Sequence, residues 1–298
     1  MTGAARGHLA MLAFSALVAG SFSLGALAAP HVSAAALTVV RFALAAALVG
    51  VAAILTTGIP RSAWRAPWRY GVLGALLASY FVLMFEGLQT AKAVPMAAVF
   101  TLTPVMAAGF GWLLLRQITT PRMAFALSLG AAGALWVIFR ADLAALMRLQ
   151  IGRGEVIFFW GCVAHALYAP MVRKLNRGEP AVVFSFGVML AGFVILLAYG
   201  WRDVAATGWA TLPGIVWICL IYVAVAASAL TFVLLQYAAL RLPAAKVMAY
   251  TYLTPSWVIL WEITLGHGAP PLLVSGGVAL TMAALAVLLK NETAASRN

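Results

Sequence analysis

The sequence predicts an all-α integral membrane protein with ten transmembrane helices, arranged as two inverted five-helix repeats. Of its 298 residues, 65% are hydrophobic and 9% are charged, and the mean hydropathy of +1.03 is far above that of soluble domains. Apolar runs of roughly 20 residues, the length that crosses the hydrocarbon layer, recur along the whole chain. A sequence pattern in the first half also returns in the second half.

The apolar runs alternate with short connectors that contain proline, glycine or charged residues. The predicted spans cover residues 8–28, 33–56, 68–89, 93–115, 121–139, 154–172, 181–200, 212–240, 243–265 and 269–289. The first run is longer than the roughly 7 to 15 apolar residues of a signal peptide, so we expect it to be a retained span. The spans use nearly the whole chain, and no soluble domain is expected.

The basic residues stand singly near the ends of spans, which indicates topology rather than a nucleic-acid surface. With the N-terminus inside, thirteen lie on the inner face: Arg6, Arg61, Arg65, Arg69, Arg116, Arg122, Arg173, Lys174, Arg177, Arg241, Lys246, Lys290 and Arg297. Five lie on the outer face: Lys92, Arg140, Arg148, Arg153 and Arg202. This excess predicts a multi-pass protein of the bacterial inner membrane with cytoplasmic N- and C-termini. We expect lipid as a partner and no nucleic acid.

An internal duplication supports the two repeats. Residues 93–104 (AVPMAAVFTLTP) and 244–255 (AAKVMAYTYLTP) are identical at five of twelve positions. The chain therefore divides into a first repeat (1–140), a connecting loop (141–153) and a second repeat (154–298). Because five is odd, the second repeat enters the membrane from the opposite side. Inverted repeats are common in secondary transporters, and Pro104 and Pro255 are hinge candidates in the paired spans, with static kinks as the alternative.

Several short motifs occur in order across both halves. They are Gly20-Ser21-Phe22, Arg41-Phe42, Leu102-Thr103-Pro104, Trp112 to Leu115, Gly154-Glu155, Ala166-Leu167-Tyr168, Arg173-Lys174-Leu175 and Leu253-Thr254-Pro255. With these motifs the chain resembles the drug/metabolite transporter superfamily, specifically the EamA-type ten-helix exporters. The resemblance implies two EamA-type repeats and an exporter function. The chain departs from the family pattern at Arg116-Gln117, where Gly-Glu is usual, and at His165, where a tryptophan is common.

Three charged residues stand out within the predicted spans: Arg41, Glu86 and Glu262. A charge inside the membrane costs a few kcal/mol and usually faces a cavity or a partner. Glu86 or Glu262 could bind a substrate amine or take up a proton, and Arg41 could neutralise a carboxylate. The alternatives are a structural ion pair between Arg41 and Glu86, and an interfacial Glu262. Ser79 shares a helix face with Glu86, which suits a polar cavity. His165 is either a proton relay or a hydrogen-bonded core residue.

These side chains, together with nearby hydroxyl and aromatic groups, form the predicted site. The predicted substrate-binding residues are Arg41, Glu86, Tyr80, Phe100, Thr103, Tyr168, Thr251, Tyr252 and Glu262. The proton-coupling candidates are Glu86, Glu262 and His165.

Catalytic and nucleotide-binding motifs are absent from the sequence, so we expect no enzyme activity, no metal and no cofactor. The sequence favours a secondary transporter that exports small polar metabolites such as amino acids by alternating access, as a uniporter or a proton antiporter. One alternative is efflux of lipophilic or cationic drug-like compounds. Another is a membrane-embedded enzyme or assembly factor. The oligomeric state is expected to be a monomer or a homodimer.

Overall fold

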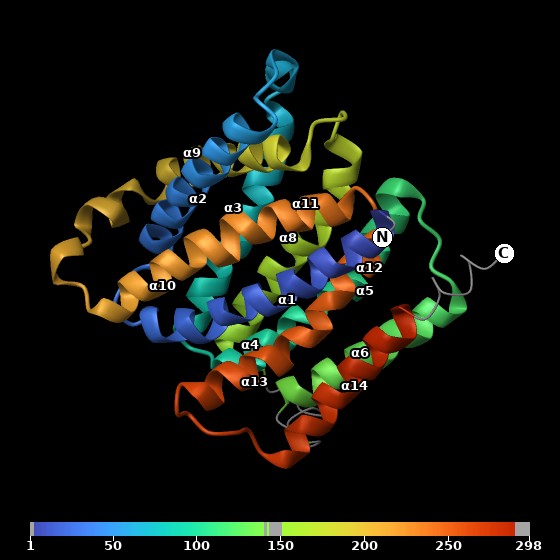
Figure 1. Ribbon diagram of the computed structural model, residues 1–298. Coiled ribbons are helices and arrows are strands. Elements are labelled where there is room, and N and C mark those ends of the chain that lie inside the picture. Colours follow the sequence, from blue (N-terminus) through green and yellow to red (C-terminus); the bar gives the residue numbers. More distant parts are fainter. Residues whose placement is uncertain (1–2, 140–141, 143–150, 290–298) are drawn as a thin grey trace.

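The computed structural model describes residues 3–139, 142 and 151–289, and all secondary structure in these residues is helical (Figure 1). The first half contains α1 (Gly3–Ala28), α2 (Ala34–Thr56), α3 (Trp68–Leu88), α4 (Ala93–Phe100), α5 (Thr103–Leu115) and α6 (Pro121–Ile138). The second half contains α8 (Arg153–Leu175), α9 (Ala181–Ala206), α10 (Gly214–Ala224), α11 (Thr231–Ala239), α12 (Ala244–Ala249), α13 (Thr254–Thr264) and α14 (Leu272–Leu289). Most of the predicted connecting loop 141–153, and the basic residues Arg140, Arg148, Lys290 and Arg297, lie outside the described residues.

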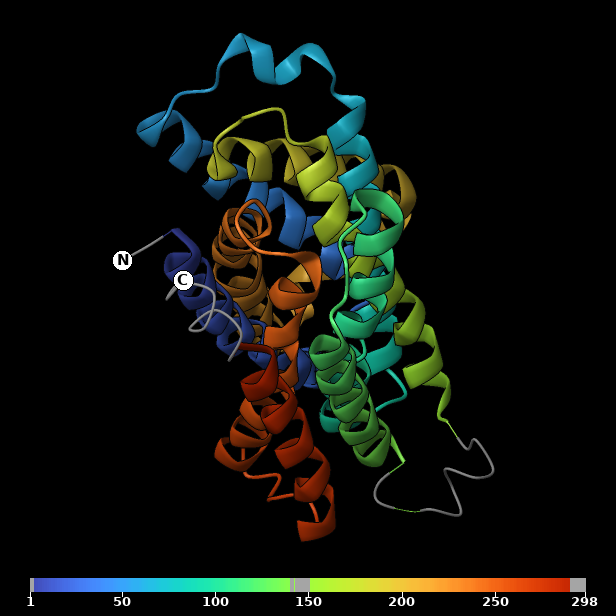
Figure 2. The ribbon, with the colours of Figure 1, turned by 90° about the vertical axis from the view of Figure 1, so that its right-hand side faces the viewer.

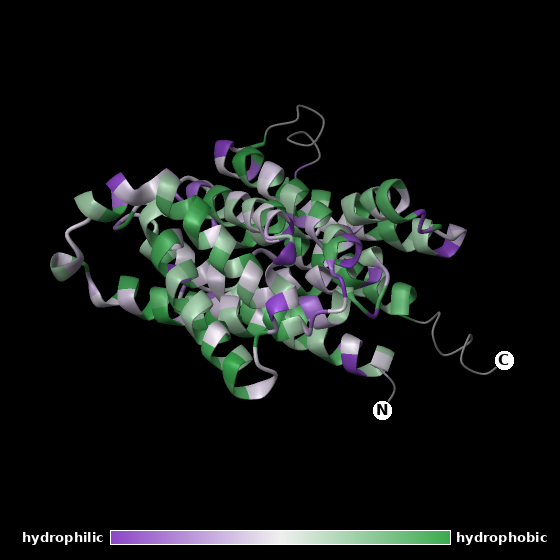
Figure 3. Ribbon diagram, turned by 90° about the horizontal axis from the view of Figure 1, so that it is seen from above, coloured by the Kyte–Doolittle hydropathy of each residue, from purple (hydrophilic) through white to green (hydrophobic). Residues whose placement is uncertain are grey.

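Nine helical segments within the described ranges are long and apolar enough to cross a membrane. The prediction for residues 243–265 differs, because that segment is divided into α12, the 3-10 helix η4 (Tyr250–Leu253) and α13. Hydrophobic residues extend along the helices (Figure 3), and large ones such as Leu55 and Leu272 point outward, with exposed fractions of 79% and 88%. An apolar outer surface of this kind suits contact with lipid and not with water.

The two central proline residues break the spans in which they lie. Pro104 is in the first turn of α5 and Pro255 is in the first turn of α13. Proline has no N–H, and its ring collides with the carbonyl group four residues earlier, so the preceding helix ends close to that point. The hydroxyl of Thr103 donates to the freed carbonyl oxygen of Phe100 at 2.7 Å, which satisfies this acceptor inside the protein.

Most helices of one half pack against helices of the other half, and the same pairings recur when the two halves are interchanged. Helix α2 packs against α9, and α6 packs against α14 (Figure 2). In the first half α3 and α5 both pack against α8, the first helix of the second half. In the second half the corresponding helices α11 and α13 both pack against α1, the first helix of the first half. Glycine permits the close crossing of α6 and α14, since a Cβ atom added at Gly277 would lie 2.7 Å from the carbonyl oxygen of Gly133.

A buried ion pair ties the connection between α8 and α9 to the start of α3. Arg69 Nη2 lies 2.6 Å from Glu179 Oε1, and the two side chains are only 1% and 7% exposed. Arg69 also donates to the carbonyl oxygens of Leu175 at 2.7 Å and Ala66 at 3.2 Å. Burial acts to raise the pKa of Glu179, but hydrogen bonds from Arg69 and from the backbone N–H of Arg177 outweigh it and hold that pKa below its ordinary value.

Candidate functional site

Aromatic and polar side chains from five helices meet in the buried centre of the bundle. The rings of Tyr80 and His165 are 4.4 Å apart between centroids, and Phe100 lies 5.2 Å from His165 and 5.7 Å from Tyr80. All are at most 2% exposed. The central cluster, as we name it here, comprises Arg41 of α2, Tyr80 and Phe81 of α3, Phe100 of α4, Phe158, His165 and Tyr168 of α8, and Gln236 of α11.

Arg41 enters this cluster from α2 and is held by the segment that joins α10 to α11. Its Nε atom donates to Ser228 Oγ at 2.5 Å, and Nη2 donates to the carbonyl oxygen of Ala227 at 2.6 Å. Both acceptors belong to a π-helical turn, η3 (Val225–Leu230), a feature that is frequent at functional sites. The guanidinium lies 3.6 Å from the centroid of the Phe81 ring, a cation-π contact.

Several polar atoms of the central cluster are buried without a hydrogen-bond partner among the described residues. They are Arg41 Nη1, Tyr80 OH, both ring nitrogens of His165 and Gln236 Oε1. The other atom of the Gln236 amide, Nε2, donates to Tyr168 OH at 2.7 Å. An unpaired buried polar group costs about 1–3 kcal/mol, so a concentration of such groups in one place suits a ligand that supplies the missing partners.

The sequence therefore predicted five members of this cluster: Arg41, Tyr80, Phe100, His165 and Tyr168. The alternative ion pair between Arg41 and Glu86 is wrong, because the guanidinium contacts Ser228 and Ala227 instead. The alternative of a hydrogen-bonded core His165 is also wrong, since neither ring nitrogen has a partner within the part of the chain that is described.

Glu86 is half-buried on α3 and is not among the residues that contact Arg41. The expectation that Glu86 and Ser79 share a polar cavity is not met. Ser79 is exposed and lines a groove on the outer surface, beside Ile195 and Tyr199 of α9.

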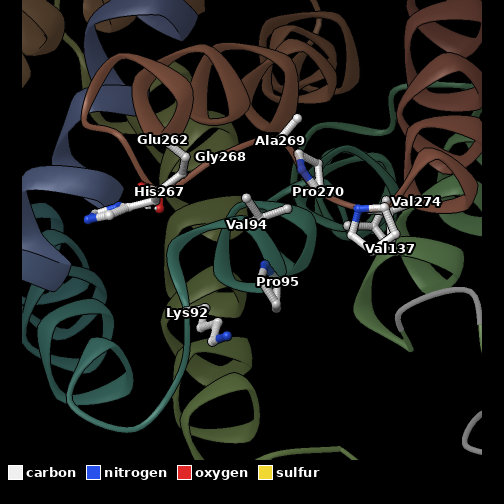
Figure 4. Close-up of a pocket in the computed structure, with 11 residues that line it drawn as sticks. Lys92, Val94, Pro95, Val137, Glu262, His267, Gly268, Ala269, Pro270 and Val274 are labelled. Carbon is white, nitrogen blue, oxygen red and sulfur yellow. Dashed lines mark hydrogen bonds and ion pairs between the residues drawn. The ribbon is translucent and has the colours of Figure 1, made fainter.

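Glu262 lies in a pocket of about 340 Å³ at one end of the bundle (Figure 4). The pocket forms where Lys92 and Pro95, at the start of α4, approach the end of α13 and the connection to α14. Glu262 Oε2 is 2.9 Å from His267 Nδ1, and these side chains are 18% and 46% exposed. Glu262 is therefore at the edge of the bundle, outside the central cluster.

Thr103, Thr251 and Tyr252 lie where the two broken spans meet. The hydroxyl oxygens of Thr103 and Thr251 are 3.1 Å apart, and both side chains are fully buried. Tyr252 packs into the space above Gly130 of α6, and its carbonyl oxygen accepts a hydrogen bond from Thr281 of α14 at 3.0 Å. These three residues connect the halves near Pro104 and Pro255.

A second pocket, of about 200 Å³, lies at the opposite end of the two broken spans, between Gln117, Arg173 and Pro243. Gln117 departs from the family pattern, and its Oε1 accepts a hydrogen bond from the backbone N–H of Ala244 at 3.1 Å, which caps α12.

Sequence reasoning missed three members of the central cluster, Phe81, Phe158 and Gln236, and it also missed Ser228. Ser228 and Gln236 were available as two of the few polar residues in the largely apolar 212–240 run, and their spacing of eight places them on one helix face. Phe158 carried no such signal, since an aromatic residue in a membrane helix is most often a packing residue.

Comparisons with known proteins agree with this architecture. Residues 5–139 and 152–290 each match the model of the EamA-like transporter family. A relative from Bacillus subtilis (strain 168), described as the uncharacterized transporter YyaM, is 25% identical over 265 residues, which cover 88% of this chain and 86% of that protein. A solved structure, described only as the crystal structure of a protein, is similar with a TM-score of 0.72 and 21% identity over 96% of this chain and 97% of that chain, and it shows the fold alone.

The family match covers both halves, and with the apolar helices it identifies a multi-pass membrane transporter of small molecules rather than an enzyme. The chain belongs to the EamA-like transporter family.

Proposed function

We propose that this protein is a secondary transporter that exports small polar metabolites such as amino acids, with the central cluster as its binding site. The observation that carries this proposal is a buried arginine with a free N–H donor, surrounded by unpartnered acceptors and aromatic rings. A guanidinium is suited to a carboxylate. The amide oxygen of Gln236, the hydroxyl of Tyr80 and a neutral His165 can accept hydrogen bonds from a substrate ammonium group.

Transport proceeds by alternating access between two inverted halves of five spans each, residues 1–140 and 154–298, joined by the loop 141–153. The exchange of packing partners between the halves supports this arrangement, and the helix breaks at Pro104 and Pro255 supply the hinges. The contact between Thr103 and Thr251, with Tyr252 beside it, closes the path between the two end pockets. The central cluster is buried, so substrate reaches it only when one end opens.

The protein resides in the bacterial inner membrane with ten spans and with both termini in the cytoplasm. The excess of basic residues on one face supports this orientation. Helix α1 begins on the side of the molecule where α14 ends (Figures 1 and 2), as the proposed topology requires.

Proton antiport supplies the energy in this proposal. Glu262 beside His267 exchanges protons with water at the end pocket that both residues line, and the half-buried Glu86 and the central His165 are further carriers. Efflux of cationic drugs is the less favoured function, because the one permanently charged member of the central cluster is positive and none of its members is acidic.

Counterflow in proteoliposomes tests the proposed function. Vesicles loaded with unlabelled amino acids should take up the labelled species when they contain the wild-type protein. Arg41→Gln should reduce uptake at least tenfold, because a hydrogen bond to a charged group contributes roughly 1.5–3 kcal/mol. The matched control is Arg202→Gln, which removes an exposed charge on α9 and should leave uptake unchanged.

If Arg41→Gln retained full uptake, the proposal that the central cluster binds the substrate would be refuted. A toxicity panel on cells that lack or overproduce the protein separates the two transporter functions. Resistance to lipophilic cations, without exchange of any metabolite, would favour drug efflux and overturn the proposal.

A further inference from the structure

A single face of the segment formed by α10, η3 and α11 presents three different chemical groups to the central cluster. Ser228, Phe232 and Gln236 follow one another at intervals of four residues, and all are at most 2% exposed. Residues four apart lie on the same side of a helix. The three side chains therefore form one buried stripe, which we name the α11 stripe.

Each member of the α11 stripe has a different neighbour. Ser228 accepts a hydrogen bond from Arg41, as described above. The ring of Phe232 lies 5.8 Å from that of Phe81. Gln236 donates to the hydroxyl of Tyr168. The stripe thus contacts the cation Arg41 at one end, is aromatic in the middle and ends in an uncharged amide.

Two atoms at the ends of the stripe are buried and have no partner in the described structure. At one end Arg41 Nη1 is a hydrogen-bond donor, and at the other end Gln236 Oε1 is an acceptor. The eight residues from Ser228 to Gln236 rise by about 12 Å along a helix axis. The free donor and the free acceptor consequently lie toward opposite ends of the stripe, with the rings of Phe81 and Phe232 between them.

We infer that the α11 stripe selects elongated substrates that carry a carboxylate at one end, a flat apolar body and an ammonium group at the other end. The carboxylate binds Arg41 Nη1, the body packs against Phe81 and Phe232, and the ammonium donates to Gln236 Oε1. This inference rests on the proposed function and narrows its substrate class.

The π turn η3 has a positioning role in this arrangement. It presents Ser228 Oγ and the carbonyl oxygen of Ala227 to the same guanidinium, which fixes Nε and Nη2 and leaves Nη1 for the substrate. Ser228 is therefore a positioning residue that acts through Arg41.

Ligand-induced thermal stabilisation of the purified protein in detergent tests the inference with three compounds, because a ligand that binds the folded state raises its stability. 4-(Aminomethyl)benzoate has both ends and the flat body, 4-methylbenzoate lacks the ammonium group, and glycine lacks the body. For the wild-type protein, the apparent Kd of 4-(aminomethyl)benzoate should be at least about tenfold lower than that of either other compound. Equal apparent Kd values of the three compounds for the wild-type protein would by themselves overturn the inference.

Gln236→Leu removes the acceptor Oε1, together with the Nε2 donor to Tyr168, at nearly constant volume. It should bring the apparent Kd of 4-(aminomethyl)benzoate to within about threefold of that of 4-methylbenzoate, whose own Kd should not change. Gln236→Met is the second variant should the first not purify as a folded protein. Retention of the tenfold preference in either folded variant would refute the role of Gln236.

Ser228→Ala should weaken binding of both benzoates alike, with the preference between them unchanged, because it acts on the carboxylate end. Ser228→Thr, which keeps a hydroxyl, should restore binding. A loss that Thr does not rescue, or a change in preference, would contradict the positioning role.

The two proposals fail in distinguishable ways. Exchange of α-amino acids in proteoliposomes, with no binding of 4-(aminomethyl)benzoate, would overturn the substrate class and leave the transport function standing. Absence of both exchange and binding would overturn both.

Discussion

Removing the charge of Glu179 should destabilise the protein in a pH-dependent way. Glu179→Gln keeps the size of the side chain but leaves the guanidinium of Arg69 without a counter-charge, although Arg69 is only 1% exposed. Loss of one partner from a buried ion pair typically costs about 3–5 kcal/mol. Because the carbonyl oxygens of Leu175 and Ala66 still accept from Arg69, we expect the lower end, about 3 kcal/mol.

The pH dependence follows from the lowered pKa of Glu179. A carboxyl group whose pKa is lower in the folded than in the unfolded state stabilises the fold above its unfolded pKa, near 4.5, and this contribution is lost as the pH falls through the folded value. The full difference between wild type and Glu179→Gln should thus be present at pH 7. It should shrink as the pH falls below about 4.

Thermal unfolding in detergent, followed by tryptophan fluorescence from about pH 3 to about pH 8, measures this difference. The expected fall in melting temperature at pH 7 is roughly 5 °C or more. Asp203→Asn, which removes an exposed carboxylate on α9, is the matched control and should shift the melting temperature by no more than about 1 °C. Equal melting temperatures for wild type and Glu179→Gln at pH 7, or a gap that widens in acid, would refute the reasoning.

Three further predictions concern other parts of the molecule. Gly277→Val should destabilise the protein by about 2 kcal/mol in the same assay, since its Cβ would meet the carbonyl oxygen of Gly133 at 2.7 Å, and an unchanged melting temperature would contradict the close crossing of α6 and α14. Thr103→Val should cost about 2 kcal/mol by removing the hydrogen bonds to Thr251 and to the carbonyl oxygen of Phe100, with a larger change in transport rate than in substrate Kd; the reverse pattern would argue against a role in closure. Glu262→Gln should flatten the pH dependence of counterflow without preventing exchange, and an unaltered pH profile would exclude this residue from proton coupling.

Much of the fold could be predicted from the sequence because the membrane restricts the choice of structure. Every backbone polar group must be satisfied within the lipid, so long apolar runs are almost obliged to be helices. For the part of the chain that the structure describes, the all-helical prediction is confirmed, and the expected span 68–89 agrees closely with α3 at Trp68–Leu88. The break near Pro104 could also be foreseen, since the effect of proline on the preceding carbonyl is local.

Features that depend on tertiary contacts were not predictable. The π turn at Val225–Leu230 lies within residues 215–240, which contain no proline or glycine, and its partner Arg41 is 187 residues from Ser228 in the chain. The ion pair joins Arg69 at the start of α3 to Glu179 in the connection between α8 and α9, 110 residues apart. The sequence indicated only that Arg69 lies on the basic face.

The candidate site was predicted only in part, because it too depends on tertiary contacts. Intramembrane charge singled out Arg41, which is central, and Glu262, which lies in an end pocket with His267. Position along a span gives the depth of a residue, but the direction of its side chain depends on helix packing. The direction of the side chain determines whether a residue such as Arg41 or Glu262 lies in the central cluster or at the edge of the bundle.

The accessibility of Cys162 tests the central claim most directly. This natural cysteine is fully buried on α8, one helical turn from His165, and a Cys219→Ala background leaves it as the only thiol. Alternating access through the central cluster predicts that a small hydrophilic thiol reagent modifies Cys162 in proteoliposomes, and that a saturating transported substrate changes the rate several-fold. A Cys162 that stays unmodified in active protein with and without substrate, while Cys introduced by Glu262→Cys at the end pocket reacts readily, would contradict it.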